Sequence, residues 1–291
     1  MDSILNFMGQ VGTAILPIFV FLTMFNVGIN RKVGDFTEYV DEWPFFLRTI
    51  LINLVAAPIV MWLLLQVVTL SQPLEVGLLI FSMVAGAPFV IKLTQYSEHD
   101  LVLGATLLVV LIFGTSVVMP LISSIILPEI EINAWQLSTT LIRQLILPII
   151  IGLVFHHFIP KLTILIRPWV AKLSNITLWV VVVGILLGEL RGIIEIMGEG
   201  AILLSIVFIL IVTVLGYFSG GHNEKDHLQD IGALGTGQRN TAAGMIIATT
   251  NFSDTPEILL IITIANTLGI IMLVMIAKFL SKDNQEEIMN I

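Results

Sequence analysis

Long runs of apolar residues, separated by short polar stretches, dominate the pattern of this 291-residue chain. A run of about 20 apolar residues is long enough to cross a hydrocarbon layer of about 30 Å as a helix. We therefore expect an all-α polytopic membrane protein with about nine transmembrane helices, and residues 1–291 as a single membrane domain. The runs lie at about 4–29, 44–67, 73–97, 101–126, 135–158, 169–189, 196–219, 227–250 and 256–281.

The composition narrows the class of protein. Hydrophobic residues make up 57% of the chain and charged residues 12%, with a mean hydropathy of +1.01, which is outside the range of soluble domains. No basic patch with interleaved aromatic residues is present, so nucleic-acid binding has no support. The chain has no cysteine, which excludes disulfides and thiolate metal sites. We expect no metal site and no cofactor, and the lack of paired catalytic carboxylates argues against an enzyme.

Lysine and arginine are distributed unequally between the two sides of the predicted spans. Because basic residues gather in cytoplasmic loops, we expect the N-terminus outside and the C-terminus inside the cytoplasmic membrane. The first apolar run has no preceding basic region and exceeds a signal-peptide core in length, so we expect a retained helix. Only Arg191 lies on the outer side, whereas the inner side carries Arg31, Lys32, Lys161, Arg167, Lys172, Lys225, Lys278 and Lys282.

Two of the apolar runs are interrupted by residues that break helices. Gly86 and Pro88 interrupt the third run, and Gly235 and Gly237 interrupt the eighth. Backbone groups freed at such breaks must be buried in protein or line a polar cavity, because lipid cannot satisfy them. The alternative explanation of each break is close helix packing at small residues.

The two interruptions also suggest an internal repeat. Each interrupted run is followed by a long uninterrupted one, and the odd offset of five runs between them gives the two motifs opposite directions across the membrane. Broken helices at matching places of inverted repeats mark the binding site of many transporters. We expect repeat one at about 4–126 and repeat two at about 135–281.

A basic residue accompanies each interruption. Lys92 follows the first and Arg239 follows the second, and a charge at membrane depth costs about 2.5–3.5 kcal/mol on insertion scales. We expect Arg239 to hold an anion through a bidentate fork, and Lys92 to act as a point charge or to carry a coupling proton. Uncharged polar contacts to the substrate are expected from Thr236, Gln238, Asn240 and Asn26.

Two of these expectations have plain structural alternatives. Asn26 lies in the first run, where a satisfied amide between helices is the other interpretation. Glu98 follows the first interrupted run; we expect either a gate or coupling residue there, or a solvated loop.

Three stretches of the chain resemble the bile acid:sodium symporter family. They are residues 235–240 (GTGQRN), 143–156 (RQLILPIIIGLVFH) and 21–36 (FLTMFNVGINRKVGDF). The resemblance runs in order over nearly the whole chain. It implies a panel domain, a core domain with two crossing broken helices, and alternating access for organic anions. Family members commonly have ten helices, and this chain is expected to begin at the second.

The chain departs from the family pattern at the positions that bind cations. Gly235 stands where the family has its sodium-binding glutamate, and Arg239 stands where it has a glutamine. The family's Ser-Asn pair aligns near Val90 and Ile91, next to Lys92. We hypothesise that the two basic side chains replace the bound cations electrostatically, which argues against sodium coupling.

The sequence thus predicts a secondary active transporter of a small organic anion, with a lipid bilayer and that anion as its partners. The coupling ion, proton or sodium, is left open, and so are the substrate and the oligomeric state. One alternative is a cation/proton exchanger, although such a protein needs a carboxylate in the membrane and we expect none deep in a span. The other alternative is a non-transporting sensor or receptor.

Overall fold

The computed structural model describes residues 2–32, 34, 39–126, 134–188, 200–221 and 226–289, and these residues form helices without any strand. Seven helical stretches are long and apolar enough to cross a membrane. They are α1 (Asp2–Ile29), α2–η3–α3 (Trp43–Leu51, Ile52–Ala56 and Ala57–Leu65), α6 (Leu101–Ile126), α7–η4–α8 (Ala134–Leu141, Ile142–Ile146 and Leu147–Phe158), α9 (Pro160–Gly188), α11 (Ala201–Ser219) and α14 (Pro256–Met289). The chain is therefore a multi-pass membrane protein.

The two remaining apolar runs each form a pair of short helices. The third run gives α4 (Gln72–Met83) and α5 (Val90–Tyr96), and the eighth gives α12 (Asp226–Gly237) and α13 (Thr241–Asn251). A short 3₁₀ helix, η2 (Val40–Glu42), precedes α2. The breaks therefore occur where glycine and proline interrupt the sequence pattern.

Several boundaries differ from the predicted ones. Helix α9 begins at Pro160 rather than at 169, and α14 continues to Met289 rather than to 281. Helix α11 is described from Ala201, while the predicted start of its run at 196, Arg191 and Lys225 lie outside the described residues. Basic and polar residues at the membrane surface lower the local hydropathy without ending a helix.

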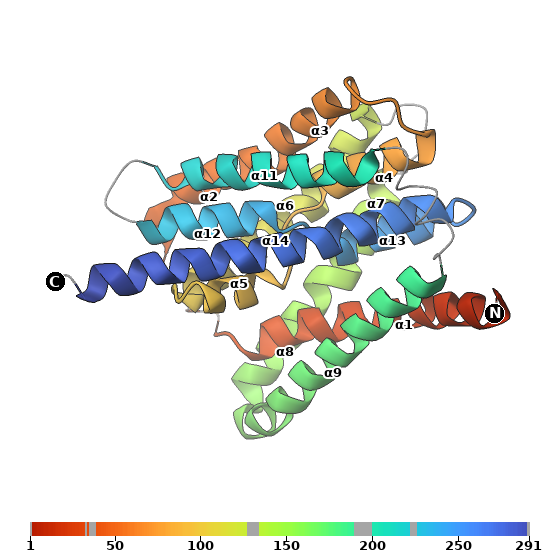
Figure 1. Ribbon diagram of the computed structural model, residues 1–291. Helices are drawn as coiled ribbons and strands as arrows, with labels where there is room; N and C mark the ends of the chain where they lie inside the picture. The colour runs from red at the N-terminus through yellow and green to blue at the C-terminus, as the bar shows by residue number, and fades with distance from the viewer. Residues whose placement is uncertain are drawn as a thin grey trace.

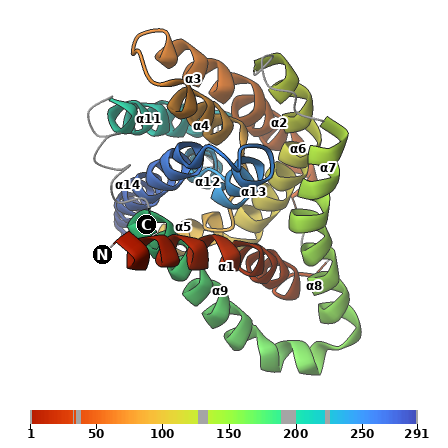
Figure 2. The ribbon, with the colours of Figure 1, turned by 90° about the vertical axis from the view of Figure 1, so that its right-hand side faces the viewer.

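The helices form two groups. Helix α1 packs along α9 and α8, and α2–α6 pack with α11–α14 (Figure 1, Figure 2), while contacts of α9 with α14 and of α7 with α6 join the two groups. Helix α1 begins at one end of the bundle and α14 ends at the opposite end (Figure 1). The two described ends of the chain therefore face opposite ends of the helix bundle.

Glycines allow the close packing of the first group. A Cβ atom on Gly152 of α8 would lie 2.8 Å from the Cα atom of Gly28 in α1, and one on Gly184 of α9 would lie 2.9 Å from the Cα atom of Gly12. These separations are too short for a side chain, so the helix backbones are in direct contact, as is common between membrane helices.

Each of two spans contains a π-helix that is closely followed by a proline. Helix η3 is followed by Pro58 and η4 by Pro148, in the segments 51–58 (LINLVAAP) and 141–148 (LIRQLILP). Single π-turns inside helices are frequent at functional sites. They lie in the second and the fifth apolar runs, which the predicted repeat with its offset of five runs does not pair, so they do not support the repeat, which stays a prediction.

Candidate functional site

The two interrupted segments meet at their breaks. The backbone N–H of Asn240 donates to the carbonyl of Val84 at 3.1 Å, and its side-chain Nδ2 donates to the carbonyl of Gly86 at 2.8 Å. The Oδ1 atom of Asn240 also accepts from the N–H of Ala243, which caps the start of α13. One asparagine therefore satisfies backbone groups on both sides of the crossing, as burial in a membrane protein requires.

The first break depends on Gly86. Its φ angle is +78°, in the left-handed region, and a Cβ atom there would lie 2.9 Å from the carbonyl carbon of Leu111 in α6. The neighbouring Ala85 exchanges hydrogen bonds with Thr115 of α6, each at 3.0 Å. Pro88 then lies in the turn that leads into α5. The extended segment at the break is thus fixed against α6.

Arg239, at the second break, is enclosed by oxygen atoms. Its Nη1 donates to Asn53 Oδ1 at 2.7 Å and to the Thr236 carbonyl at 3.2 Å. Its Nη2 donates to the Asn53 carbonyl at 3.3 Å and to the Ser82 carbonyl, and its Nε donates to the Phe81 carbonyl at 3.3 Å. The side chain is only 1% exposed.

This oxygen cage uses every hydrogen-bond donor of the guanidinium. A guanidinium has five N–H donors, and each is accounted for by one of the bonds just described. None of the acceptors is a carboxylate, so the charge is stabilised by oxygen dipoles and by the ring of Phe208, whose centroid lies 5.8 Å from Cζ. The carbonyls of Phe81 and Ser82 belong to the last turn of α4, where the helix dipole favours a cation. A bidentate fork on a substrate would require Arg239 to exchange these partners.

The second span supplies a backbone carbonyl to this cage for a local reason. In the π-helix η3 the N–H of Ala57 donates to the carbonyl of Ile52, five residues earlier. The same pattern would pair the carbonyl of Asn53 with the nitrogen of Pro58, which has no hydrogen. The Asn53 carbonyl is therefore left for Arg239.

The neighbours of Arg239 in the second break contact adjacent helices. The hydroxyl of Thr236 accepts from Asn53 Nδ2 at 3.0 Å. A Cβ atom on Gly235 would lie 2.5 Å from a side-chain carbon of Leu107, and one on Gly237 would lie 2.7 Å from a side-chain carbon of Leu273. Helix α12 therefore needs small residues at both positions to fit against α6 and α14.

A cavity opens beside the crossing, between α1 and α9 on one side and α5, α13 and α14 on the other. It has about 890 Å³ of empty space, counted up to and including its mouth. Of the residues predicted for the site, Asn26, Pro88, Lys92, Gln238, Arg239 and Asn240 line it, whereas Gly86, Glu98, Gly235, Thr236 and Gly237 are not among its lining. No aspartate or glutamate is among the described residues that line the cavity.

The polar side chains of the cavity come from both groups of helices. Lys92 is exposed on α5, and its Nζ lies 3.4 Å from Gln95 Oε1. Asn26 of α1 accepts a hydrogen bond from Asn30 through Oδ1 at 3.0 Å. Ser174 and Asn175 of α9 complete the polar part on that side. Lys92, unlike Arg239, lies where a soluble anion can reach it.

Glu98 is placed in the turn between α5 and α6. It is exposed and has a φ angle of 59°, which is rare for a residue other than glycine. It follows α5, which lines the cavity. Its predicted role as a gate or coupling residue stays a prediction.

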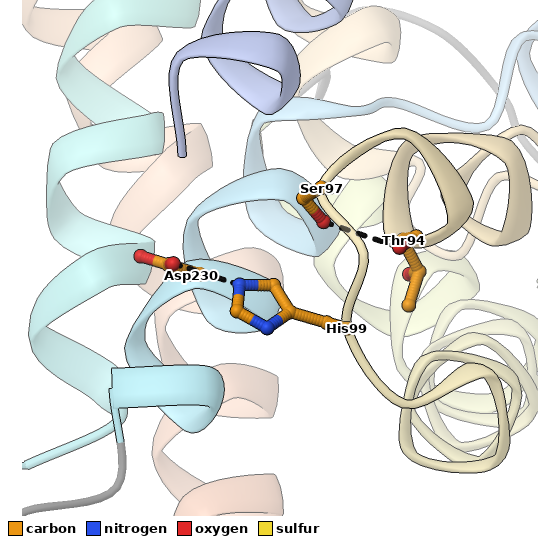
Figure 3. Close-up of polar contacts among 4 residues, drawn as sticks. All are labelled: Thr94, Ser97, His99 and Asp230. Atoms are coloured by element: carbon orange, nitrogen blue, oxygen red, sulfur yellow. Dashed lines mark hydrogen bonds and ion pairs between the residues drawn. The ribbon is translucent and has the colours of Figure 1, made fainter. Parts of the chain in front are cut away.

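A buried histidine–aspartate pair lies near this turn and was not predicted from the sequence. His99 Nε2 is 2.8 Å from Asp230 Oδ2, and the two side chains are 6% and 9% exposed (Figure 3). The nearby Ser97 hydroxyl donates to the carbonyl of Thr94, at the end of α5. The pair joins the α5–α6 turn to α12. Asp230 is buried near the start of α12, so the expectation that no carboxylate lies deep in a span stays a prediction.

Three amide side chains of the site were also not predicted from the sequence. Asn53 holds Arg239, and Asn175 and Asn266 line the cavity. A signal was present for each, because an asparagine within an apolar run carries a polar group that must find a partner. Asn53 is further marked by Pro58, five residues later.

Comparison with known proteins gives a family match and two relatives. The model of the sodium bile acid symporter family matches residues 17–196. The probable sodium/metabolite cotransporter BASS5, chloroplastic, of Arabidopsis thaliana is 23% identical over 242 residues, which are 79% of this chain and 60% of that protein. The probable sodium/metabolite cotransporter BASS6, chloroplastic, of the same plant is 26% identical over 250 residues, or 82% of this chain and 61% of that protein. The chain thus spans about three fifths of the length of these relatives.

Proposed function

Because this chain belongs to the sodium bile acid symporter family, we propose that it is a secondary active transporter of a small organic anion. The cavity beside the crossing is the observation that carries this proposal. It presents the Lys92 ammonium and several amides, and its described lining contains no carboxylate. A cation together with neutral hydrogen-bond donors favours an anionic ligand.

Alternating access is the mechanism that we propose. The cavity lies between the group of α1, α8 and α9 and the group that contains both interrupted segments. Rocking of one group against the other would expose the cavity to each side in turn. In this proposal the first group is the panel domain and the second is the core domain, built from inverted repeats.

Arg239 supports the proposal that sodium does not bind at the crossing. Five protein oxygens surround its guanidinium, and several oxygen ligands are also what a hard metal cation requires. We propose that Arg239 is a built-in cation, and that Lys92 alone of the two basic residues contacts substrate. The coupling ion is then a proton, or sodium bound elsewhere.

The proposed orientation places the N-terminus outside and the C-terminus in the cytoplasm, in the cytoplasmic membrane. It is supported by the excess of basic residues on one side of the predicted spans. The opposite ends at which α1 begins and α14 finishes agree with it (Figure 1).

Ligand-dependent thermal stability of the purified protein tests the anion site. Small carboxylates, sulfonates and sulfate are each added while sodium and pH are varied separately, because a ligand of the folded state raises its stability. We expect a carboxylate to stabilise the wild type and the Lys172→Gln variant, whose lysine lies over Trp169 outside the cavity. The Lys92→Gln variant is expected to bind at least tenfold more weakly. Unchanged anion binding by Lys92→Gln would refute this site.

Flux into proteoliposomes tests transport itself. Uptake of the stabilising anion is compared under a pH gradient, a sodium gradient and neither. We expect a pH gradient to drive accumulation. Accumulation driven by sodium alone would show a cation site outside the Arg239 cage, and binding without any flux would favour a sensor or receptor.

A cation/proton exchanger is the second candidate, and the buried Asp230–His99 pair is the observation that favours it. An exchanger requires a carboxylate that binds proton and cation in turn. Sodium-driven proton flux in the absence of any organic anion, lost in Asp230→Asn, would support the exchanger over the anion transporter.

A further inference from the structure

Gln238, in the second break, carries a buried acceptor without a partner. Its side chain is 2% exposed, and its Oε1 atom makes no hydrogen bond to any residue that the structure describes. Leaving a buried acceptor unsatisfied costs about 1–3 kcal/mol. Gln238 lines the cavity, so this unpartnered acceptor belongs to a side chain that borders the space.

The orientation of this amide is fixed by a backbone carbonyl. Gln238 Nε2 lies 3.3 Å from the carbonyl oxygen of Arg239 and 3.1 Å from Asn266 Oδ1. A flipped amide would place Oε1 against the Arg239 carbonyl, where two acceptors would repel each other. The nitrogen therefore faces these oxygens, and the unpartnered atom is the oxygen.

Asn266 of α14 adds a donor beside this acceptor. Its Oδ1 is engaged by Gln238, which leaves its Nδ2 as a donor without a hydrogen bond to the described part of the chain. Asn266 is 5% exposed and also lines the cavity. The pair thus offers one acceptor and one donor side by side.

We propose that Gln238 and Asn266 form a subsite for a hydroxyl group on the transported anion. A hydroxyl is the smallest group that donates to Oε1 and accepts from Nδ2 at once. A substrate ammonium would also donate to Oε1, but the cavity has a lysine and no carboxylate among its described residues to balance it. The inference rests on the proposed function and narrows its substrate class to hydroxycarboxylates, with the carboxylate at Lys92.

The test compares acids of one length on the purified full chain. Binding of hexanoate, 2-hydroxyhexanoate and 6-hydroxyhexanoate is measured by thermal shift and confirmed by calorimetry. We expect at least one hydroxy acid to bind the wild type about tenfold more tightly than hexanoate, because it satisfies a buried acceptor. Equal affinities for all three acids would overturn the hydroxyl subsite while leaving the anion site intact. Binding of none of them would overturn both.

Substitutions then locate the preference. The Gln238→Met variant is expected to lose the hydroxyl preference, and Asn266→Leu is expected to do the same. Gln66→Met is the matched control, since Gln66 is exposed at the end of α3, outside the cavity. A preference retained in both cavity variants would overturn the assignment. The wild-type comparison needs no substitution, so the subsite is tested even where a variant does not fold.

Discussion

Asn53 binds the guanidinium of Arg239 with two of its atoms, its side-chain Oδ1 at 2.7 Å and its backbone carbonyl at 3.3 Å. The two residues are 186 positions apart in the sequence. Asn53 Nδ2 in turn donates to Thr236, one turn before Arg239. One asparagine thus joins the second span to the second break and stabilises the charge of Arg239.

Replacing Asn53 with leucine is expected to destabilise the protein strongly. The change removes the side-chain acceptor of a buried cation whose other four acceptors are backbone carbonyls, and hydrogen bonds to charged groups contribute about 1.5–3 kcal/mol each. We expect thermal unfolding in detergent to begin about 5–10 °C lower. Asn175→Leu, at an exposed amide of α9, is the matched control and is expected to unfold close to the wild-type temperature. Similar loss in both variants would argue against the cage.

Removing the Arg239 charge is expected to create a response to sodium. In Arg239→Gln the oxygens of Asn53, Phe81, Ser82 and Thr236 lose their cation, and a metal ion can take its place. We expect sodium chloride to raise the unfolding temperature of this variant by about 2–4 °C over choline chloride. The wild type should show no difference between the two salts. A sodium response in the wild type would mean that a cation site exists outside the Arg239 cage.

The spans and the two breaks were predictable because they depend on local composition. Apolar runs mark the helices, and Gly86 with its positive φ interrupts a helix for reasons contained in one residue. The start of α9 at Pro160 was missed because Lys161 and Arg167 lower the local hydropathy while the helix continues. Hydropathy reports the apolar part of a helix and not its full length.

The contacts of the site were not predictable in the same way. The sequence indicates that Arg239 lies at a break, but its partners come from Asn53 and from carbonyls of α4. A backbone carbonyl has no sequence signature, except where Pro58 removes its usual donor. The pair of His99 and Asp230 was not predictable either, because the two residues lie far apart in the sequence. Both lie near the ends of predicted segments, where hydropathy favours solvated residues.

Asp100 is expected to stabilise the protein in a pH-dependent way. Burial raises the pKa of its carboxyl, but hydrogen bonds from Tyr39 and from the backbone of Val102 and Leu103, together with the charge of Arg31, outweigh this and lower it. A depressed pKa means that the stabilisation is present above the unfolded value of about 3.9 and is lost as the pH falls through the folded value.

The unfolding temperature of Asp100→Asn, followed from pH 7 to pH 3, measures this effect. Asparagine is as good an N-cap as aspartate, so the variant keeps an acceptor for the N–H of Val102 and loses the charge and the second carboxylate oxygen, which accepts from Tyr39. We expect it to be less stable than the wild type at pH 7, with the difference shrinking below about pH 4. Because Asp100 is exposed, the difference is expected to be small and reduced by salt. A difference that is constant with pH would show that the charge has no part in it.

The His99–Asp230 pair is expected to hold the α5–α6 turn against α12. Its two side chains are almost fully enclosed, and His99 Nε2 lies 2.8 Å from Asp230 Oδ2 (Figure 3), so removing either partner takes a hydrogen bond from a buried polar group, at a cost of about 1–3 kcal/mol. We expect Asp230→Leu and His99→Leu each to lower the unfolding temperature, and the double variant to lose less than the sum, because the two residues share one interaction. Glu98→Gln, at the exposed neighbouring position, is expected to change stability little. Additive losses in the double variant would show that the contact contributes nothing beyond the separate burial of its two side chains.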